Sequence, residues 1–186
     1  MNALNEIELP MLDFIAEHLR CAFLDFLLPK ITLLGDAGIF WIILALALLI
    51  PKATRKTGVM MAVALILGLI VCNITIKPLV ARMRPYDVRD ISPYLAELQH
   101  DFSFPSGHTT ASFEGATVIL CRHRKWGVAA CVLAALIAFS RMYLYVHYPT
   151  DILAGLILGV TFGLCGVWIV EHAEGYIKSK KAQASE

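Results

Sequence analysis

Charged residues are scarce in this chain. Asp, Glu, Lys and Arg make up only 17% of its 186 residues, whereas soluble domains carry about 25%. Hydrophobic residues make up 58%, and the mean hydropathy is +0.68. The net charge of +1 gives no basic surface that would attract nucleic acid. The composition therefore predicts an integral membrane protein whose partner is the lipid bilayer and not nucleic acid.

Paired cysteines, repeats and a signal peptide are also missing. The five cysteines form no CxxC pair and lie mostly in apolar runs, which favours packing over a disulfide or a metal site. Residues 1–20 are too acidic and too mixed for a cleavable signal peptide. Because no repeat or low-complexity stretch interrupts the chain, we expect one membrane-embedded domain over residues 1–186. Nothing in the pattern indicates an oligomeric state.

Five apolar runs predict transmembrane helices: residues 37–50, 58–76, 109–121, 126–139 and 152–170. The second run rises about 28 Å as a helix, close to the hydrocarbon thickness. The last carries Gly155, Gly159 and Gly163, a small-residue stripe that lets helices approach closely in lipid. The expected fold is therefore an all-α membrane bundle with five firm transmembrane helices.

The N-terminal residues 5–34 form an amphipathic or partly inserted segment in this prediction. Residues 5–20 mix apolar and acidic side chains at a spacing that suits a helix lying in the membrane interface. Residues 21–34 are more apolar but contain Asp25, Pro29 and Lys30. A broken or re-entrant span and a second interfacial helix both fit this second part.

Basic residues predict the topology. The loop after the first span, the loop after the third span and the C-terminal tail each hold three Lys or Arg residues. The positive-inside rule places these three segments in the cytoplasm. The segments 77–108 and 147–151 then lie on the opposite, extracytoplasmic face of the cell membrane.

Three short motifs fall on that face. The first has Lys77, six further residues, and then Arg84-Pro85. The second is Pro105-Ser106-Gly107-His108 at the start of a predicted helix, and the third has Ser140-Arg141, five residues, His147, three residues and Asp151. Ionisable residues at the membrane surface are costly and therefore indicate function. Membrane-edge anchors and a plain helix cap explain each motif alone, but not all three together on one face.

This set of side chains suits a phosphoryl group. Arg84 and Arg141 can bind its oxygens in forked fashion, Lys77 adds a point charge, and free amides at the helix start favour an anion. Asp151 can hold one imidazole nitrogen of His147, which leaves the other free to attack phosphorus. His108 is then left to protonate the departing oxygen.

The three motifs together resemble the signature of the type 2 phosphatidic acid phosphatase superfamily, which reads KX6RP, PSGH and SRX5HX3D. All three are complete over residues 77–151. The resemblance implies a phosphatase that needs no metal or other cofactor and works through a phosphohistidine intermediate. It implies that His147 is the nucleophile, Asp151 orients it and His108 is the general acid. The phosphate-binding residues that it implies are Lys77, Arg84, Ser106, Gly107 and Arg141.

Membrane members of that family have six spans and an extracytoplasmic site, whereas five firm spans are predicted here. The implied substrate is a membrane lipid phosphate or diphosphate. By analogy with short relatives that serve cell wall biogenesis, undecaprenyl diphosphate is our first choice; phosphatidylglycerophosphate and phosphatidic acid are the alternatives. An anion transporter is the remote alternative from another class, although the sequence has no inverted repeat.

The third predicted span is short and carries a polar face. Thr110, Glu114, Thr117 and Cys121 share one side of the helix, which should turn toward the bundle. Glu114 could form part of the wall of the active-site cleft or make a buried hydrogen bond between helices.

Overall fold

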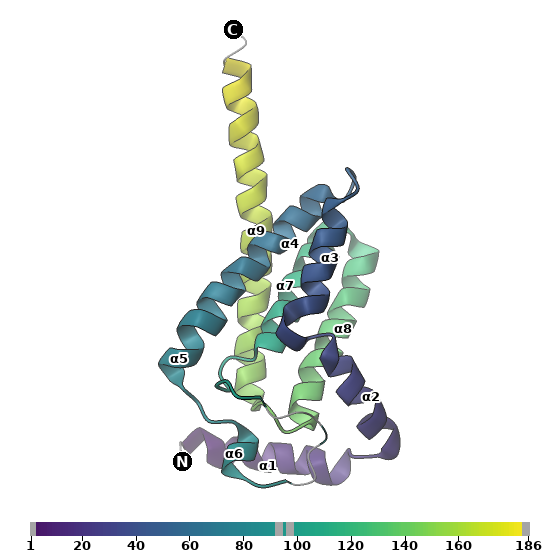
Figure 1. Cartoon of the computed structure of the whole chain (residues 1–186), viewed down its shortest axis with the longest axis vertical. Coiled ribbons are helices and arrows are strands. Elements are labelled where there is room, and N and C mark those ends of the chain that lie inside the picture. The colour runs from purple at the N-terminus through teal and green to yellow at the C-terminus, as the bar shows by residue number, and fades with distance from the viewer. Residues whose placement is uncertain (1–2, 92–94, 96–98, 184–186) are drawn as a thin grey trace.

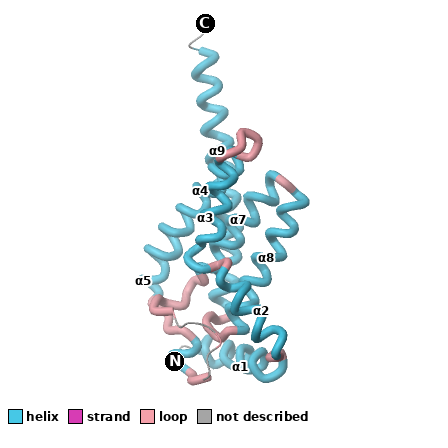
Figure 2. Tube along the Cα trace, turned by 45° about the vertical axis from the view of Figure 1, so that its right-hand side comes forward, coloured by secondary structure: helices cyan, strands magenta, loops and turns pink. Residues whose placement is uncertain are grey.

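Every regular element is a helix in the computed structural model, which describes residues 3–91, 95 and 99–183 (Figures 1 and 2). The α-helices are α1 (Ala3–His18), α2 (Ala22–Leu33), α3 (Ile39–Leu49), α4 (Arg55–Gly68), α5 (Lys77–Val80), α6 (Pro85–Val88), α7 (Gly107–Arg122), α8 (Arg124–Tyr143) and α9 (Pro149–Gln183). A 3-10 turn, η1 (Asp36–Gly38), precedes α3, and a π-helical stretch, η2 (Leu69–Ile76), joins α4 to α5. The all-α prediction is confirmed.

Helix α7 forms the centre of the bundle. It packs against α4, α8 and α9, and most of its residues are buried. The predicted small-residue stripe of α9 makes one of these contacts. A Cβ atom added at Gly159 would lie 2.6 Å from the carbonyl oxygen of Thr110, and one added at Gly163 would lie 2.7 Å from the Cβ of Thr117. Glycine therefore permits a helix spacing that any larger residue would widen.

The polar face of α7 turns inward over most of its length. Thr110, Glu114 and Thr117 are buried, as predicted. Cys121 is exposed, so its predicted place on the inward face is wrong. It lies in the last turn of α7, beyond the point where the neighbouring helices cover that face.

Three helical stretches of the described chain are long and apolar enough to cross a membrane: Arg55–Val88, Arg124–Tyr143 and Pro149–Ile177. A fourth candidate combines α2 with η1 and α3, which meet at a bend of 41°. This pair fits a broken span or a re-entrant loop, as residues 21–34 suggested. Helix α7 has only 16 residues and many polar ones, because protein rather than lipid surrounds it. The count of five spans stays a prediction.

Large apolar side chains cover the outside of the bundle. They include Ile43, Leu46, Ile66, Leu69, Val132, Leu153 and Ile157, each at least 50% exposed. An exposed apolar surface of this extent marks a lipid-facing or binding surface. Together with the candidate spans, it identifies an integral membrane protein.

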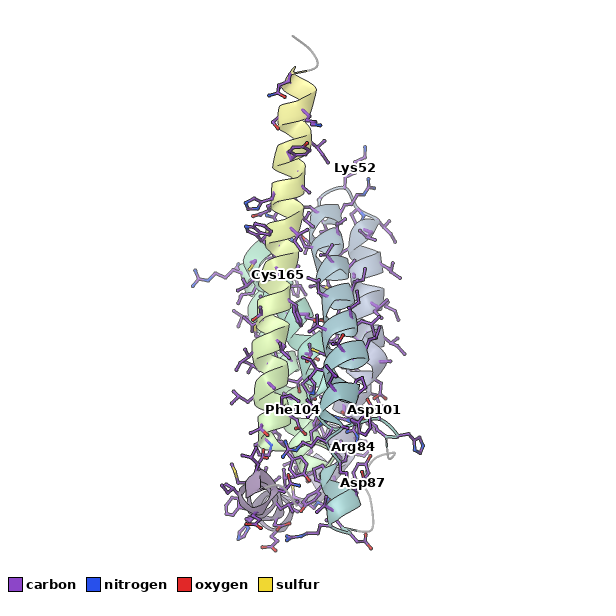
Figure 3. All side chains as sticks on the ribbon, turned by 90° about the vertical axis from the view of Figure 1, so that its left-hand side faces the viewer. Lys52, Arg84, Asp87, Asp101, Phe104 and Cys165 are labelled. Atoms are coloured by element: carbon purple, nitrogen blue, oxygen red, sulfur yellow. The ribbon has the colours of Figure 1, made fainter. Side chains whose placement is uncertain are left out.

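The two ends of the bundle differ. The turn between α3 and α4, the turn between α7 and α8, and the far part of α9 lie at one end, where Lys56 pairs with Glu174 at 2.6 Å and Arg122 with Glu171 at 3.5 Å. Figure 3 shows Lys52 at this end and Arg84 and Asp101 at the opposite end. Helix α1 lies crosswise beneath that opposite end (Figure 1). The basic turns and the motif residues thus lie at opposite ends of the bundle, and which end faces the cytoplasm stays a prediction.

Candidate active site

The three motifs meet at the end of the bundle that α1 covers. The long helix α4–η2–α5 ends at Ala81, whose φ of 46° is left-handed, and the chain then turns to Arg84. Arg84 Nη1 donates to the carbonyl oxygen of Val146 at 2.8 Å, which links the first motif to the third. The Ser106 amide donates to the carbonyl oxygen of Asp151 at 3.1 Å, which links the second to the third. Backbone contacts thus bring together segments far apart in sequence.

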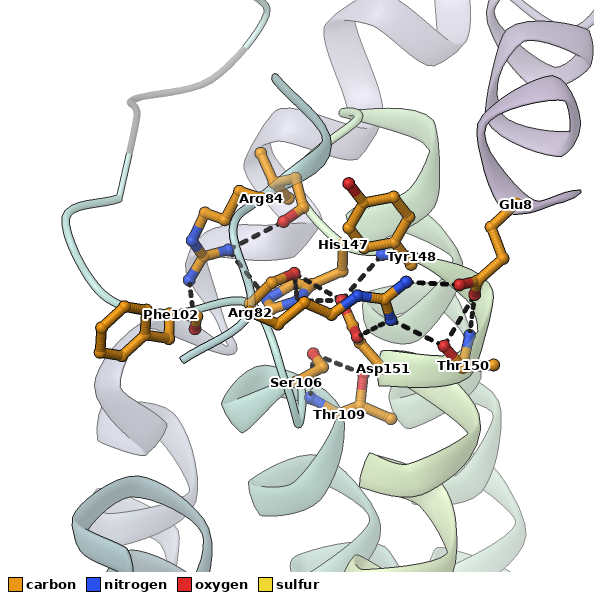
Figure 4. Close-up of polar contacts among 12 residues, drawn as sticks. Glu8, Arg82, Arg84, Phe102, Ser106, Thr109, His147, Tyr148, Thr150 and Asp151 are labelled. Carbon is orange, nitrogen blue, oxygen red and sulfur yellow. Dashed lines mark hydrogen bonds and ion pairs between the residues drawn. The ribbon is translucent and has the colours of Figure 1, made fainter. Parts of the chain in front are cut away.

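His147 is oriented by groups around Asp151, as Figure 4 shows. Helix α9 begins at Pro149, and the Tyr148 amide donates to Asp151 Oδ2 at 2.9 Å. Ser103 Oγ donates to the same oxygen at 2.5 Å. His147 Nδ1 lies 3.4 Å from this oxygen and 3.4 Å from Ser103 Oγ. The carboxylate therefore holds the Nδ1 side of the ring.

The Nε2 side of His147 faces Arg84. Arg84 Nη1 lies 3.2 Å from Nε2. Because a guanidinium can only donate, Nε2 must be the unprotonated nitrogen, and Nδ1 carries the proton. Burial, and then the positive charges of Arg84 and Arg141, hold the pKa of His147 well below its ordinary value. A neutral imidazole with its lone pair on Nε2 is the form that can attack phosphorus.

Lys77 and Arg84 together hold one carboxylate. Arg84 Nη2 donates to Asp101 Oδ1 at 2.5 Å, and Lys77 pairs with Asp101 Oδ2. Burial acts to raise the pKa of Asp101, but the bonds and charges of Lys77 and Arg84 prevail and lower it to about 2. The Asp101 side chain is 52% exposed. It occupies the place between two cations where an anionic ligand would bind.

The remaining predicted phosphate ligands differ in how many of their polar atoms already have hydrogen-bond partners. Ser106 is buried and caps α7, where its Oγ accepts from the Thr109 amide at 3.4 Å and the Thr109 hydroxyl at 3.0 Å. Arg141 Nη1 donates to Thr32 Oγ1 at 2.6 Å, while its buried Nε has no partner in the described part of the chain. A Cβ atom at Gly107 would lie 3.2 Å from Asn73 Oδ1 and 3.9 Å from Lys77 Nζ, so the helix start closely adjoins the cation.

His108 lines a groove and contacts a second carboxylate. Its Nε2 is 2.7 Å from Asp36 Oδ1, in the bend between α2 and α3. The groove has a volume of about 1,030 Å³ and runs between α3, α4–η2 and α7. Its polar end includes Lys77, Asp101, Gly107 and His108, and its walls are apolar, with Ile42, Leu46, Leu65, Ile66 and Leu69. His147, Arg84 and Arg141 are buried and are not among the lining residues.

Comparison with protein-family models shows which family the chain belongs to. The model of the PAP2 superfamily matches residues 57–174, more than half of the chain. The chain belongs to the PAP2 superfamily. The family of membrane phosphatases implied by the three motifs is thus confirmed, and the match contains every predicted site residue.

Two PAP2-related proteins and one crystal structure illustrate the similarity. An undecaprenyl-diphosphatase from Sulfolobus acidocaldarius is 32% identical over 69% of this chain, and a putative undecaprenyl-diphosphatase from Escherichia coli is 38% identical over 71%. The matched stretch spans 63% and 66% of their own lengths. A transmembrane PAP2-type phosphatidylglycerolphosphate phosphatase from Bacillus subtilis is 25% identical, with a TM-score of 0.71, and the match covers 95% of this chain and 89% of that chain.

Several polar residues of this PAP2 site are not among the specified residues of the three motifs. Arg82 is one of the unspecified positions of the first motif and Asp101 lies between the first and second motifs, and both contact motif residues. Ser103 and Asp36, which contact the two histidines, gave no sequence signal beyond their proximity to the motifs or to a bend. In the described chain, no group of three or more His, Cys, Asp or Glu residues is arranged to hold a metal ion.

Proposed function

We propose that this PAP2 protein is an integral-membrane lipid phosphatase that removes a terminal phosphate through a phosphohistidine on His147. The observation that carries the proposal is the pair of contacts on the imidazole, with Asp151 on the Nδ1 side and the Arg84 donor at Nε2. These contacts favour the tautomer that an in-line attack on phosphorus requires.

The reaction proceeds in two steps. The Nε2 lone pair of His147 attacks the terminal phosphorus, and the bond from phosphorus to the leaving oxygen breaks with its electron pair. His108 donates a proton to that oxygen. The same residue then takes a proton from water, which attacks the phosphohistidine, so that the N–P bond breaks and inorganic phosphate leaves.

The cations receive the substrate in place of Asp101. A phosphoryl group carries more charge than a carboxylate and can bind Arg84 and Lys77 while Asp101, half-exposed, swings away. Arg84 then donates to a phosphoryl oxygen instead of to Nε2. Arg141 through its unpaired Nε, and Ser106 and Gly107 at the start of α7, complete the phosphate site in this proposal.

Undecaprenyl diphosphate is the first-choice substrate. The groove supports this choice because its walls are apolar and a polyprenyl chain has no polar atoms to satisfy. The two undecaprenyl-diphosphatase relatives named above point to the same substrate class. Because residues 77–108 are too few for a separate headgroup-binding domain, recognition rests on the phosphate and on the chain.

One observation favours the glycerophospholipid alternative, phosphatidylglycerophosphate or phosphatidic acid. Glu114 lines the groove, and its Oε1 has no hydrogen-bond partner in the described part of the chain. It lies six residues beyond His108, a rise of about 9 Å along α7. A carboxyl group at that depth can hydrogen-bond with an ester or hydroxyl group of a glycerolipid, whereas a polyprenyl chain offers it nothing.

The proposed setting is the cell membrane, with the site on the extracytoplasmic face. The basic turns at the far end of the bundle support this orientation. We further propose that α7 and the bent α2–α3 pair complete a five-span, single-domain protein. The cations Lys77, Arg84 and Arg141 supply the charge that a metal would otherwise provide, so the enzyme should work without one.

The deciding experiment measures phosphate release by the purified protein in detergent. Undecaprenyl diphosphate, phosphatidylglycerophosphate and phosphatidic acid are compared side by side, with EDTA present. The wild type should be active, and His147→Ala should lose essentially all turnover while remaining folded. An inactive wild type together with saturable anion transport in vesicles would favour the transporter alternative; full activity of His147→Ala would overturn the nucleophile.

Phosphate release from Glu114→Leu separates the two lipid classes. If the substrate is a polyprenyl diphosphate, this variant should retain its kcat/KM. If the substrate is a glycerolipid, kcat/KM should fall for that lipid alone. Equal losses on both lipids would reject Glu114 as a discriminating residue.

A further inference from the structure

Arg82 is buried beside Asp151 although the first motif leaves its position unspecified (Figure 4). Its Nη1 donates to Asp151 Oδ1 at 2.7 Å and to Thr150 Oγ1 at 2.8 Å. Asp151 Oδ2 is already engaged by Ser103 and the Tyr148 amide. Arg82 therefore supplies the donor for the second carboxylate oxygen and fixes the rotation of the group that holds His147.

The other side of Arg82 reaches the N-terminal helix α1. Its Nη2 donates to Glu8 Oε2 at 2.5 Å and to Asn5 Oδ1 at 3.0 Å. The guanidinium also lies 3.8 Å from the ring centre of Tyr148. Only 8% of the Arg82 side chain and 4% of the Glu8 side chain are exposed. One buried guanidinium thus joins a carboxylate of α1 to the carboxylate at the active site.

Glu8 also holds the start of the helix that carries Asp151. Glu8 Oε1 accepts from the Thr150 amide at 2.7 Å and from the Thr150 hydroxyl at 2.8 Å. The first amides of a helix have no partner within the helix, and a carboxylate there is favoured by the helix dipole. Glu8 therefore acts on Asp151 in two ways, through Arg82 and through the first turn of α9.

Fastening α1 to the bundle does not require this buried pair. Leu9 and Leu12 pack in an apolar cluster with Tyr145 and Tyr148, and Arg89 pairs with Asp13 at the exposed edge of the same helix. Replacing a buried ion pair by apolar residues is often neutral or stabilising, so the need to bind α1 does not explain why an ion pair is buried here. The contact of the pair with Asp151 does explain it.

We propose that Arg82 and Glu8 are positioning residues of the phosphatase reaction, so that helix α1 completes the active site. The inference rests on the proposed function. It goes beyond the family match, which begins at residue 57 and leaves α1 outside. Among the described residues, the hydrogen bonds of Arg82 and Glu8 run to Asp151, Thr150, Asn5 and each other and not to His147 or to another predicted phosphate ligand, so each acts through Asp151 on His147. Their loss should lower kcat and leave KM near the wild-type value.

The test compares Arg82→Gln and Glu8→Gln with the control Arg89→Gln in the purified full-length protein. Arg89 also links the segment after α5 to α1, through its ion pair with Asp13, but Arg89 does not contact Asp151. We expect kcat to fall roughly 10- to 100-fold in Arg82→Gln, the range seen when outer hydrogen-bond partners of histidine–carboxylate sites are removed. Arg82→Lys should restore part of kcat, and the double variant Arg82→Gln/Glu8→Gln should lose less than the product of the two single losses.

The outcomes separate this inference from the proposed function. Wild-type kcat in Arg82→Gln, a change confined to KM, or an equal loss in Arg89→Gln would overturn the positioning role while the phosphatase reading stands. A wild-type protein that releases no phosphate from any lipid would overturn both. If Arg82→Gln does not fold, as judged by its melting temperature and monodispersity, the nearly isosteric Glu8→Gln decides: a lowered kcat with unchanged KM supports the inference, and wild-type kcat overturns it.

Discussion

At the scale of single residues, the site is organised by which groups can donate and which can accept. Arg84 can only donate, so its contact with Nε2 assigns the tautomer of His147. Asp101 can only accept when it is ionised, and its carboxylate accepts hydrogen bonds from both Lys77 and Arg84. In the proposed reaction, the free enzyme therefore starts with a neutral His147 and with Asp101 in the place proposed for the phosphate.

The lowered pKa of His147 predicts the acid side of the pH profile. Burial and nearby positive charges favour the neutral ring, so it stays unprotonated below the ordinary histidine pKa of about 6.5. We expect kcat/KM, which reports the free enzyme, to hold level as the pH falls through about 6.5 and to decline only at more acidic values. The ionisation of the lipid phosphate is titrated separately in the same detergent. An enzymatic pKa at or above about 6.5 on the acid limb of the profile would contradict the prediction.

The second residue-scale prediction concerns Asp101. Its carboxylate competes with phosphate for Lys77 and Arg84, so Asp101→Asn should bind inhibitory anions more tightly. We expect the inhibition constants of inorganic phosphate and orthovanadate to fall roughly tenfold, equivalent to about 1.4 kcal/mol. Glu6→Gln, an exposed position of α1, makes the same change of charge and should leave both constants unchanged. Weaker inhibition of Asp101→Asn would show that this carboxylate helps to bind the anion.

At the scale of elements, the site depends on how closely α7 and α9 approach each other. Helix α7 starts at the PSGH motif and α9 starts just before Asp151, so their spacing sets the relative position of His108 and His147. The glycine stripe of α9 keeps that spacing small. The π-helical stretch Leu69–Ile76 lies immediately before Lys77, and π-helical turns are frequent at functional sites.

Gly159→Leu should therefore destabilise the bundle and lower activity together. Its Cβ alone would come within 2.6 Å of the Thr110 carbonyl oxygen, and backbone cannot move aside cheaply. Overpacking of this kind costs about 1–3 kcal/mol, visible as a lower melting temperature in detergent. Gly175→Leu is the matched control, because a Cβ at Gly175 meets nothing within 4 Å. A melting temperature that falls equally in both variants would mean that the helix contact is not the cause.

At the scale of the whole molecule, the chain separates its basic turns from its chemistry. The site lies at the end that α1 covers (Figure 1). The groove is lined by residues of α3, α4, η2 and α7. The lipid-facing surface is apolar, and an apolar groove between helices suits a substrate whose chain stays in the bilayer. Because the site lies at one end of the bundle, the orientation of the protein in the membrane decides which leaflet supplies the substrate.

Single cysteines placed in a cysteine-free variant test the orientation. Ala53→Cys, in the exposed turn between α3 and α4, should react with an impermeant maleimide only from the cytoplasm. His100→Cys, exposed near the site, should react only from outside. The predicted topology also places Ala96 outside, but this residue is not among the described ones. Phosphate release from intact cells serves as an independent readout. The reverse labelling pattern would move the chemistry to the inner leaflet.

The sequence alone determined the helical class, the family and the residues of the three motifs. Hydrophobic runs follow from composition, and the motif spacings are short enough for one helix start or one turn to fix their geometry, as at His147 and Asp151. The stripe of glycines likewise reads directly as a close helix contact. Each of these features is local along the chain, which is why the sequence could predict it.

Only the tertiary structure decided which residues support the motifs. Glu8 meets Arg82 across 74 positions, and Asp36 meets His108 across 72. No local spacing encodes such pairs, because they depend on where a crossing helix and a bend settle against the bundle. Burial is also decided by packing. The length of α7 does not reveal that other helices surround it, and the helical spacing of Cys121 does not reveal that the end of α7 is left exposed. The sequence specified the residues of the three motifs, and helix packing specified what holds them in place.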